Sequence, residues 1–209
     1  MVTEDRSNLM EECVMSKNSC VTVIYPKSIP VNNGAENCFL LGPCTNAPPY
    51  HEDVIDIFAR LAREDKKMIS LRINCPKREG EMVRALDVVA PPAEIHHTYA
   101  RQREWEFETQ ESAAFSAGLL FCFVKQGNNA VPEKVYGAIT QVEFGYWLAR
   151  ASVDRRIRIA YYSDGIYNHQ LRVLLHDIER LAPWLLPMHT SFESLCAQSL
   201  AWAKQGPSK

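Results

Sequence analysis

The chain has 209 residues, 46% of them hydrophobic and 23% charged, with a formal net charge of −2. This length allows one sizeable core and requires no second domain. The near-neutral charge provides no general field for nucleic acid or an anionic membrane surface. No segment approaches the roughly 20 apolar residues that span a bilayer. We therefore expect neither polymeric nucleic acid nor a membrane among its partners.

The seven cysteines are an odd number and contain no CxxC pair. Cys122 lies in an apolar run and Cys196 on an apolar helix stripe, where a thiol usually acts as a small hydrophobe. The first residues, MVTEDRSNLMEEC, have acids where a signal peptide would have a basic region and an apolar run. These features favour a reducing compartment, and we expect a cytoplasmic protein.

The first part of the chain alternates short apolar runs with one amphipathic helix. Residues 1–18 are polar and acidic, which predicts a frayed tail. Strands are predicted at residues 20–25, 38–41 and 67–73, the first of them at a sheet edge. A helix is predicted over 52–65 from the apolar residues Val54, Phe58, Leu61 and Ala62.

Gly42 and Pro43 directly follow the second predicted strand. Such a pair lets the backbone turn sharply and approach a ligand closely. A simple loop is the other interpretation, and the residues themselves leave both open.

The segment 77–98 has no clear period and predicts a connection between elements. His96 and His97 lie in it, but no third ligand stands at a recognisable spacing. We therefore expect no metal and no cofactor.

A polar helix and a strongly apolar strand follow. The helix is predicted at 99–117, anchored to the sheet by Trp105 and Phe115. Gln102 and Glu106, four residues apart, share one face of it. The run LLFCFV at 119–124 predicts a strand buried on both faces of a parallel sheet.

The next helix is expected to begin at Thr140 and carries Glu143 near its first turn. Its apolar face is assigned to Ile139, Val142, Tyr146 and Ala149. Glu143 then has two compatible interpretations. In a capping box with Thr140 it would bond a free backbone N–H, and at the carboxyl edge of a parallel sheet it would face a ligand.

The last third predicts one strand and two helices. The strand at 156–162 lies near a sheet edge, and a leucine-rich stripe from Leu171 to Leu181 predicts a helix. Thr190 and Glu193 predict a capping box at the start of the last helix. Residues 205–209 are predicted to form a loose end. The alternation predicts an α/β, single-domain flavodoxin-like fold over 19–204, a doubly wound parallel sheet with helices on both faces.

Several motifs occur in a fixed order: CFLLGPC at 38–44, QREWE at 102–106, an apolar strand, and ITQVEFGYWL at 139–148. Together they resemble the nucleoside 2-deoxyribosyltransferase-like family, and in particular a branch with an LAGP-type strand, a Q-x-x-W-E helix and a TTNVEFGRWL-type helix. With the opening strand and the TSFESL start of the last helix, the resemblance spans roughly residues 20–203.

The resemblance implies a site. The Glu of the family's E-x-G motif is the nucleophile, which makes Glu143 the attacking group here, and Glu106 of the Q-x-x-W-E pattern the second carboxyl group. The substrate-binding residues that it implies are Phe39, Gly42, Pro43, Gln102 and Gly145. Relatives commonly complete their sites across a subunit interface, so we also expect a homo-oligomer.

The loop from 125 to 138 is long for a connection between a strand and a helix. It could close over the pocket, where Asn128 and Tyr136 could touch a base or a phosphate. A surface loop with no role is the alternative.

The chemistry expected is cleavage or transfer of an N-glycosidic bond of nucleosides or nucleotides. Glu143 would form a glycosyl ester and Glu106 would give a proton to the leaving base, by analogy with retaining glycoside hydrolysis. A 2-deoxyribosyltransferase passes the sugar to a second base, and an N-glycosidase passes it to water. The alternative is a non-catalytic nucleotide-binding module on the same scaffold.

Overall fold

The computed structural model describes residues 19–24, 35–44, 47–65, 69–76, 99–125, 137–165 and 168–208. The strands are β1 (Ser19–Ile24), β2 (Glu36–Leu41), β3 (Ile69–Asn74), β4 (Gly118–Phe123) and β5 (Ile159–Ser163). The helices are α1 (Tyr50–Glu64), α2 (Tyr99–Ala114), α3 (Ala138–Val153), α4 (Asn168–Leu181), the 3₁₀ turn η2 (Pro183–Leu185) and α5 (Phe192–Gln205).

The five strands form one sheet in the order β1-β3-β2-β4-β5, and every pairing is parallel. The predicted α/β, doubly wound parallel fold is therefore confirmed. β3 lies on one side of β2, and β4 and β5 lie on the other side. The direction in which strands are added therefore reverses at β2, as it does in other doubly wound sheets. β1 extends the sheet beyond β3. Both strands predicted near an edge, β1 and β5, occupy the edges.

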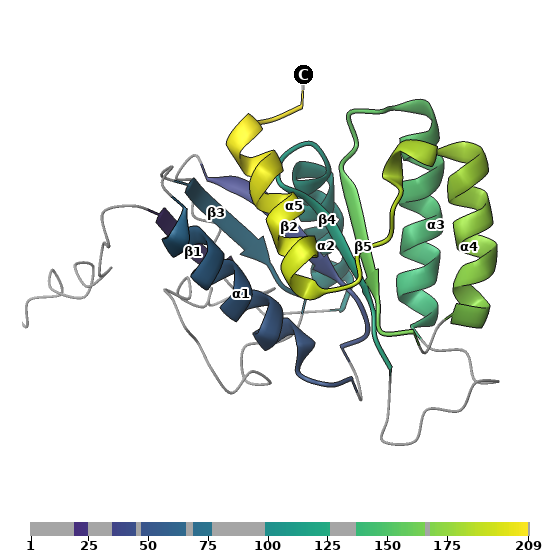
Figure 1. The fold of residues 1–209 in the computed structure, drawn as a ribbon, viewed down its shortest axis with the longest axis horizontal. Coiled ribbons are helices and arrows are strands. Elements are labelled where there is room, and N and C mark those ends of the chain that lie inside the picture. The colour runs from purple at the N-terminus through teal and green to yellow at the C-terminus, as the bar shows by residue number, and fades with distance from the viewer. Residues whose placement is uncertain are drawn as a thin grey trace, which may run out of the picture.

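Helices cover both faces of the sheet (Figure 1). On one face α1 and α5 pack together over a core that includes Phe58, Leu120 and Leu195. On the other face α2, α3 and α4 cover a core built around Phe121 and Trp147. All six residues of β4 are buried, as its continuous apolar run predicts, because alternate side chains enter the two cores.

The structure corrects the expected start and buried face of α3. The helix begins at Ala138, with Gly137 as its N-cap in the left-handed region and no side-chain cap. Ile139, Val142 and Tyr146 are exposed, at 63%, 74% and 44%. The buried face is instead Phe144, Trp147, Leu148 and Ala151. These residues stand at i, i+3, i+4 and i+7, and they carry the larger rings into the core.

Two smaller predictions also change, one about the start of α5 and one about the last residues of the sequence. The N-cap of α5 is Ser191, whose Oγ accepts a hydrogen bond from the Ser194 N–H, so the Thr190–Glu193 capping box is wrong. The end of the chain is held, because the backbone N–H of Ser208 donates to the carbonyl of Phe115 over 2.8 Å. Of the described helices, none is both long and apolar enough to cross a membrane.

Candidate functional site

A cavity of about 390 Å³ opens at the carboxyl ends of the central strands. Its floor is formed by Gly42 and Pro43, which follow β2, and by Pro76, which follows β3. Because β3 and β4 lie on opposite sides of β2, this is the point where the winding direction reverses. Open α/β sheets bind their ligands at such a point.

Two helices supply the polar walls of this cavity. Gln102, Arg103, Glu106 and Gln110 come from α2, and Glu143 comes from α3. The α2 residues stand three and four positions apart, which places them along one side of the helix. The cavity is thus polar on the helical side and closed by backbone turns on the sheet side.

Among the described residues, both hydrogen-bond donors to Glu143 contact the same one of its two oxygens. Its side chain is 16% exposed, and its Oε1 accepts a hydrogen bond from Nη1 of Arg103 over 3.0 Å. The same Oε1 has a longer contact, 3.5 Å, with Nε2 of Gln110. Within the described part of the chain, Oε2 of Glu143 has no hydrogen-bond partner. That oxygen is available to a ligand in the cavity.

Burial is the main influence on the charge of Glu143. It raises the pKa of this carboxyl above its ordinary value, because a charged group loses hydration in the cavity wall. The hydrogen bond and positive charge of Arg103 and the amide of Gln110 oppose the rise. The negative charge of Glu106 adds to it.

Both oxygens of Glu106 are occupied. Oε1 accepts a hydrogen bond from Nε2 of Gln102 over 2.9 Å, and Oε2 accepts one from Nη1 of Arg103. The same Arg103 nitrogen therefore joins the two carboxylates that the sequence singles out. Each oxygen of Glu106 keeps a second lone pair, which could carry a proton for a leaving group.

Two residues of this cavity, Arg103 and Gln110, were not singled out from the sequence. Gln110 is oriented by the core, because its Oε1 accepts a hydrogen bond from Nε1 of the buried Trp147 over 2.8 Å, which turns its amide nitrogen toward Glu143. The helical spacing of positions 103, 106 and 110 could have indicated both residues. The motif QREWE itself contains Arg103.

Gly42 allows an unusually close approach of chain segments. A Cβ atom built at this position would lie 2.8 Å from the carbonyl oxygen of Cys122 and 2.2 Å from Oη of Tyr50. Of the two interpretations of the Gly-Pro pair, a tight turn at a cavity fits these distances. Beside it, the ring of Phe39 lies 5.8 Å from that of Trp105.

Six of the residues singled out from the sequence meet in this cavity. They are Phe39, Gly42, Pro43, Gln102, Glu106 and Glu143. Gly145 is not among the residues that line it, and a Cβ atom there would meet nothing within 4 Å. Tyr136 and Asn128 lie outside the described residues.

The capping-box interpretation of Glu143 is wrong. The helix begins two residues before Thr140, so Thr140 is a buried residue of the first turn rather than the N-cap. Glu143 bonds to side chains of α2, not to the end of its own helix. Its position in the cavity wall therefore owes nothing to capping.

No group of three His, Cys, Asp or Glu side chains that could hold a metal ion occurs among the residues that the structure describes. No model of a known protein family matches the chain, and the curated proteins contain no significant match to it.

Proposed function

We propose that the chain is an N-glycosidic enzyme of the nucleoside 2-deoxyribosyltransferase-like type, acting on nucleosides or nucleotides. The observation that carries this proposal is the burial and hydrogen bonding of Glu143 at the point where the winding of the sheet reverses. It is a largely buried carboxylate with one oxygen fixed by Arg103 and Gln110 and the other open to the cavity.

The geometry fits the first step of a double displacement. With Oε1 held, Oε2 of Glu143 would attack the anomeric carbon of the sugar as the bond to the base breaks. The electron pair of the broken bond leaves with the base, which takes up a proton, and the sugar stays on Glu143 as an ester. Water or a second base then attacks the anomeric carbon and loses a proton. The bond from the sugar to Glu143 breaks, and Glu143 returns to its carboxylate form.

The other residues of the cavity would position the substrate. Burial between the turn at Gly42 and helix α2 removes Glu143 from bulk water, which strengthens its interaction with positive charge developing on the sugar. Arg103 keeps the two acidic side chains together, while the flat edge formed by Phe39 and Pro43 could accept a base.

Homo-oligomerisation forms part of the proposal. Ile139 lines the cavity, and it belongs to the exposed apolar face of α3 together with Val142 and Tyr146. The ring of Phe107 on α2 lies 5.9 Å from the ring of Tyr146 and extends this face. Burying such a face against a second copy would remove apolar area from water at the cavity mouth.

The test is direct. The protein is incubated with a panel of deoxynucleosides, ribonucleosides and their monophosphates, with and without a free acceptor base, and released or exchanged base is measured by chromatography. Glu143→Gln should abolish the reaction, because the amide cannot form the ester. Glu108→Gln, at an exposed position of α2, is the matched control and should retain activity.

The remaining outcomes separate the alternatives. Saturable nucleotide binding without base release, unaffected by Glu143→Gln, would favour the non-catalytic binding module and overturn the enzyme. Release that persists in Glu143→Gln would exclude Glu143 as the nucleophile. A covalent adduct on Glu143, found by mass spectrometry with a slow-turnover fluorinated deoxynucleoside, would support the mechanism.

A further inference from the structure

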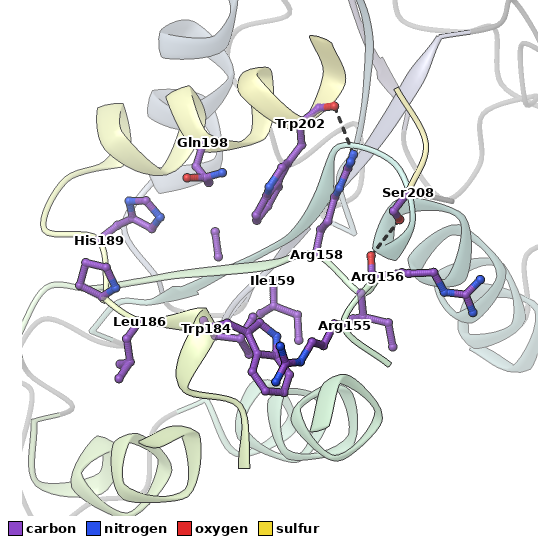
Figure 2. Close-up of a pocket in the computed structure, with 14 residues that line it drawn as sticks. Arg155, Arg156, Arg158, Ile159, Trp184, Leu186, His189, Gln198, Trp202 and Ser208 are labelled. Atoms are coloured by element: carbon purple, nitrogen blue, oxygen red, sulfur yellow. Dashed lines mark hydrogen bonds between the residues drawn. The ribbon is translucent and has the colours of Figure 1, made fainter. Parts of the chain in front are cut away.

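A second cavity, of about 480 Å³, lies beside the first residues of β5 and shares no lining residue with the first (Figure 2). Its volume falls among those of small-ligand pockets, roughly 300–1,000 Å³. Trp202 and Gln198 reach it from α5, and Trp184 from η2. Trp202 packs on one core of the sheet and Trp184 on the other, so the cavity wraps around the edge of the sheet.

The backbone of β5 is unpaired at this edge. The Leu119 N–H donates to the carbonyl of Arg158 over 2.9 Å, so Arg158 faces β4. Since backbone groups alternate along a strand, the N–H and C=O of Ile159 point the other way, toward the cavity. Neither has a partner in the part of the chain that the structure describes.

A proline explains why the edge stays open. The His189 N–H donates to the carbonyl of Tyr161 over 2.9 Å, which forms one parallel bridge beside β5. In the same register, the N–H two residues before His189 would donate to the carbonyl of Ile159. That residue is Pro187, which has no N–H. The sheet therefore cannot extend along the cavity.

The cavity is positively charged. Arg155, Arg156, Arg158 and His189 line it, and none of the described residues in its lining is an Asp or a Glu. Arg156 is neutralised by Asp154 at 2.8 Å. Burial lowers the pKa of His189, which favours its neutral form. The excess charge therefore comes from the two remaining arginines.

These two arginines differ in what they can still bind. Arg158 donates to the carbonyls of Ser116, Trp202 and Gly206, and these bonds hold the end of the chain. The guanidinium of Arg155 lies 4.5 Å from the centre of the Trp184 ring. Within the described ranges, no carboxylate is at ion-pair distance from Arg155. It is the cation that an incoming ligand can reach.

Two contacts occupy backbone groups on either side of Ile159, which limits the length of chain that could pair there. At one end the hydroxyl of Ser208 donates to the carbonyl of Arg156 over 2.8 Å. At the other end His189 occupies the edge at Tyr161. The five residue steps between these points span at most roughly 16–18 Å, even with the chain fully extended. A peptide strand would have to continue past both ends, so the space suits a small molecule.

We propose that this cavity is a second binding site, for a small molecule with a flat apolar body and one anionic group. The apolar body lies between Trp184 and Trp202, and the anion binds Arg155. The outward N–H of Ile159 supplies a donor.

Two naphthalene probes test the site: 2-naphthoate, which is anionic, and 2-naphthamide, which has the same ring system without the charge. Binding is measured by calorimetry and by the indole N–H signals in ¹⁵N NMR spectra. The naphthoate should shift the signals of Trp184 and Trp202 and leave those of Trp105 and Trp147 in place. The amide should bind about tenfold more weakly, because it lacks the charged acceptor.

Variants decide whether the binding occurs at this site. Arg155→Glu, at an exposed position, should weaken naphthoate binding about tenfold or more. Arg63→Ala, an exposed arginine on α1, and Glu143→Gln should leave the affinity unchanged. The proposal is overturned by an absence of saturable naphthoate binding at millimolar concentration, by equal binding to Arg155→Glu, or by binding that shifts Trp105 and is lost in Glu143→Gln.

Discussion

Nη1 of Arg103 lies 3.0 Å from Oε1 of Glu143, a residue of another helix and 40 positions later in the chain. The same guanidinium bonds to Glu106 on its own helix. This contact brings the QREWE motif and the E-x-G motif together at one point of the cavity. It also places a positive charge where two acidic side chains would otherwise repel each other.

Arg103→Met should shift the pH dependence of activity. Arg103 lowers the pKa of Glu143 against the effect of burial, so its removal raises that pKa further. In the proposed mechanism Glu143 attacks in its ionised form, so the acidic limb of the kcat/KM profile should move to higher pH. Profiles of wild type, Arg103→Met and Arg103→Lys with a reactive nucleoside check this.

Arg103→Lys is the matched control, because it keeps the positive charge but loses the planar fork. Its acidic limb should lie between those of the wild type and Arg103→Met. An unshifted limb in Arg103→Met would mean that the titrating group is not Glu143.

Glu143→Gln should stabilise the folded protein at neutral pH. The raised pKa of Glu143 means that its stabilising contribution is complete below the ordinary glutamate pKa and is lost as pH rises through the folded-state value. At pH 7 the wild type therefore carries the cost of a buried charge, which the amide avoids. Urea denaturation should give the variant the larger free energy of unfolding at pH 7.

The same comparison at about pH 4, near the ordinary glutamate pKa, should show a smaller difference. Glu108→Gln makes the same change at an exposed position of α2 and is the matched control. If Glu143→Gln is less stable than the wild type at pH 7, the bond to Arg103 outweighs burial and the reasoning fails.

Gly42→Ala should lower the free energy of unfolding by about 1–3 kcal/mol. The new methyl group would lie 2.8 Å from the carbonyl of Cys122, and backbone cannot yield as a flexible side chain does. Gly145→Ala is the matched control. It adds a methyl group to a helix position with open space and should stabilise by about 0.5–1 kcal/mol. Denaturant titration of both variants checks the contrast.

Gly145→Ala also tests one implication of the family resemblance. If Gly145 touches substrate, the alanine variant should raise KM. From its place outside the cavity lining we expect KM to remain unchanged.

Val142→Asp should reduce self-association. Val142 is 74% exposed in the middle of the apolar face of α3, so a charge there would have to be buried in any contact that uses this face. Val173→Asp, at a 66% exposed position of α4, is the control. Sedimentation velocity should show a concentration-dependent species for the wild type and Val173→Asp, but not for Val142→Asp. A wild type that is monomeric at all concentrations would contradict the proposed oligomer.

Much of the fold follows from local pattern. The unbroken run LLFCFV can only be buried on both sides, and β4 lies between β2 and β5. The edge position of β1 was indicated by Pro26, which ends its β-branched run, and that of β5 by its alternating pattern. The order of the strands in the sheet could not be predicted to this detail, because it depends on which crossovers pack best and not on any one segment.

The candidate site was predictable in part. The motifs singled out Glu143, Glu106 and Gln102, but a single-helix view of Glu143 suggested a capping role that the partner helix α2 replaces. The apolar face of α3 was misassigned for a related reason. Two apolar stripes run along this helix, and only packing against Phe121 and Tyr161 decides which one is buried.

The proposed attack by the open Oε2 of Glu143 has a stereochemical consequence. A sugar bound to that oxygen would have to be approached from the opposite side to be released, so the configuration at its anomeric carbon would be inverted twice. A β-nucleoside split in the presence of methanol would then yield the methyl β-glycoside first. Direct attack by water or methanol, without the ester, would give the α-anomer.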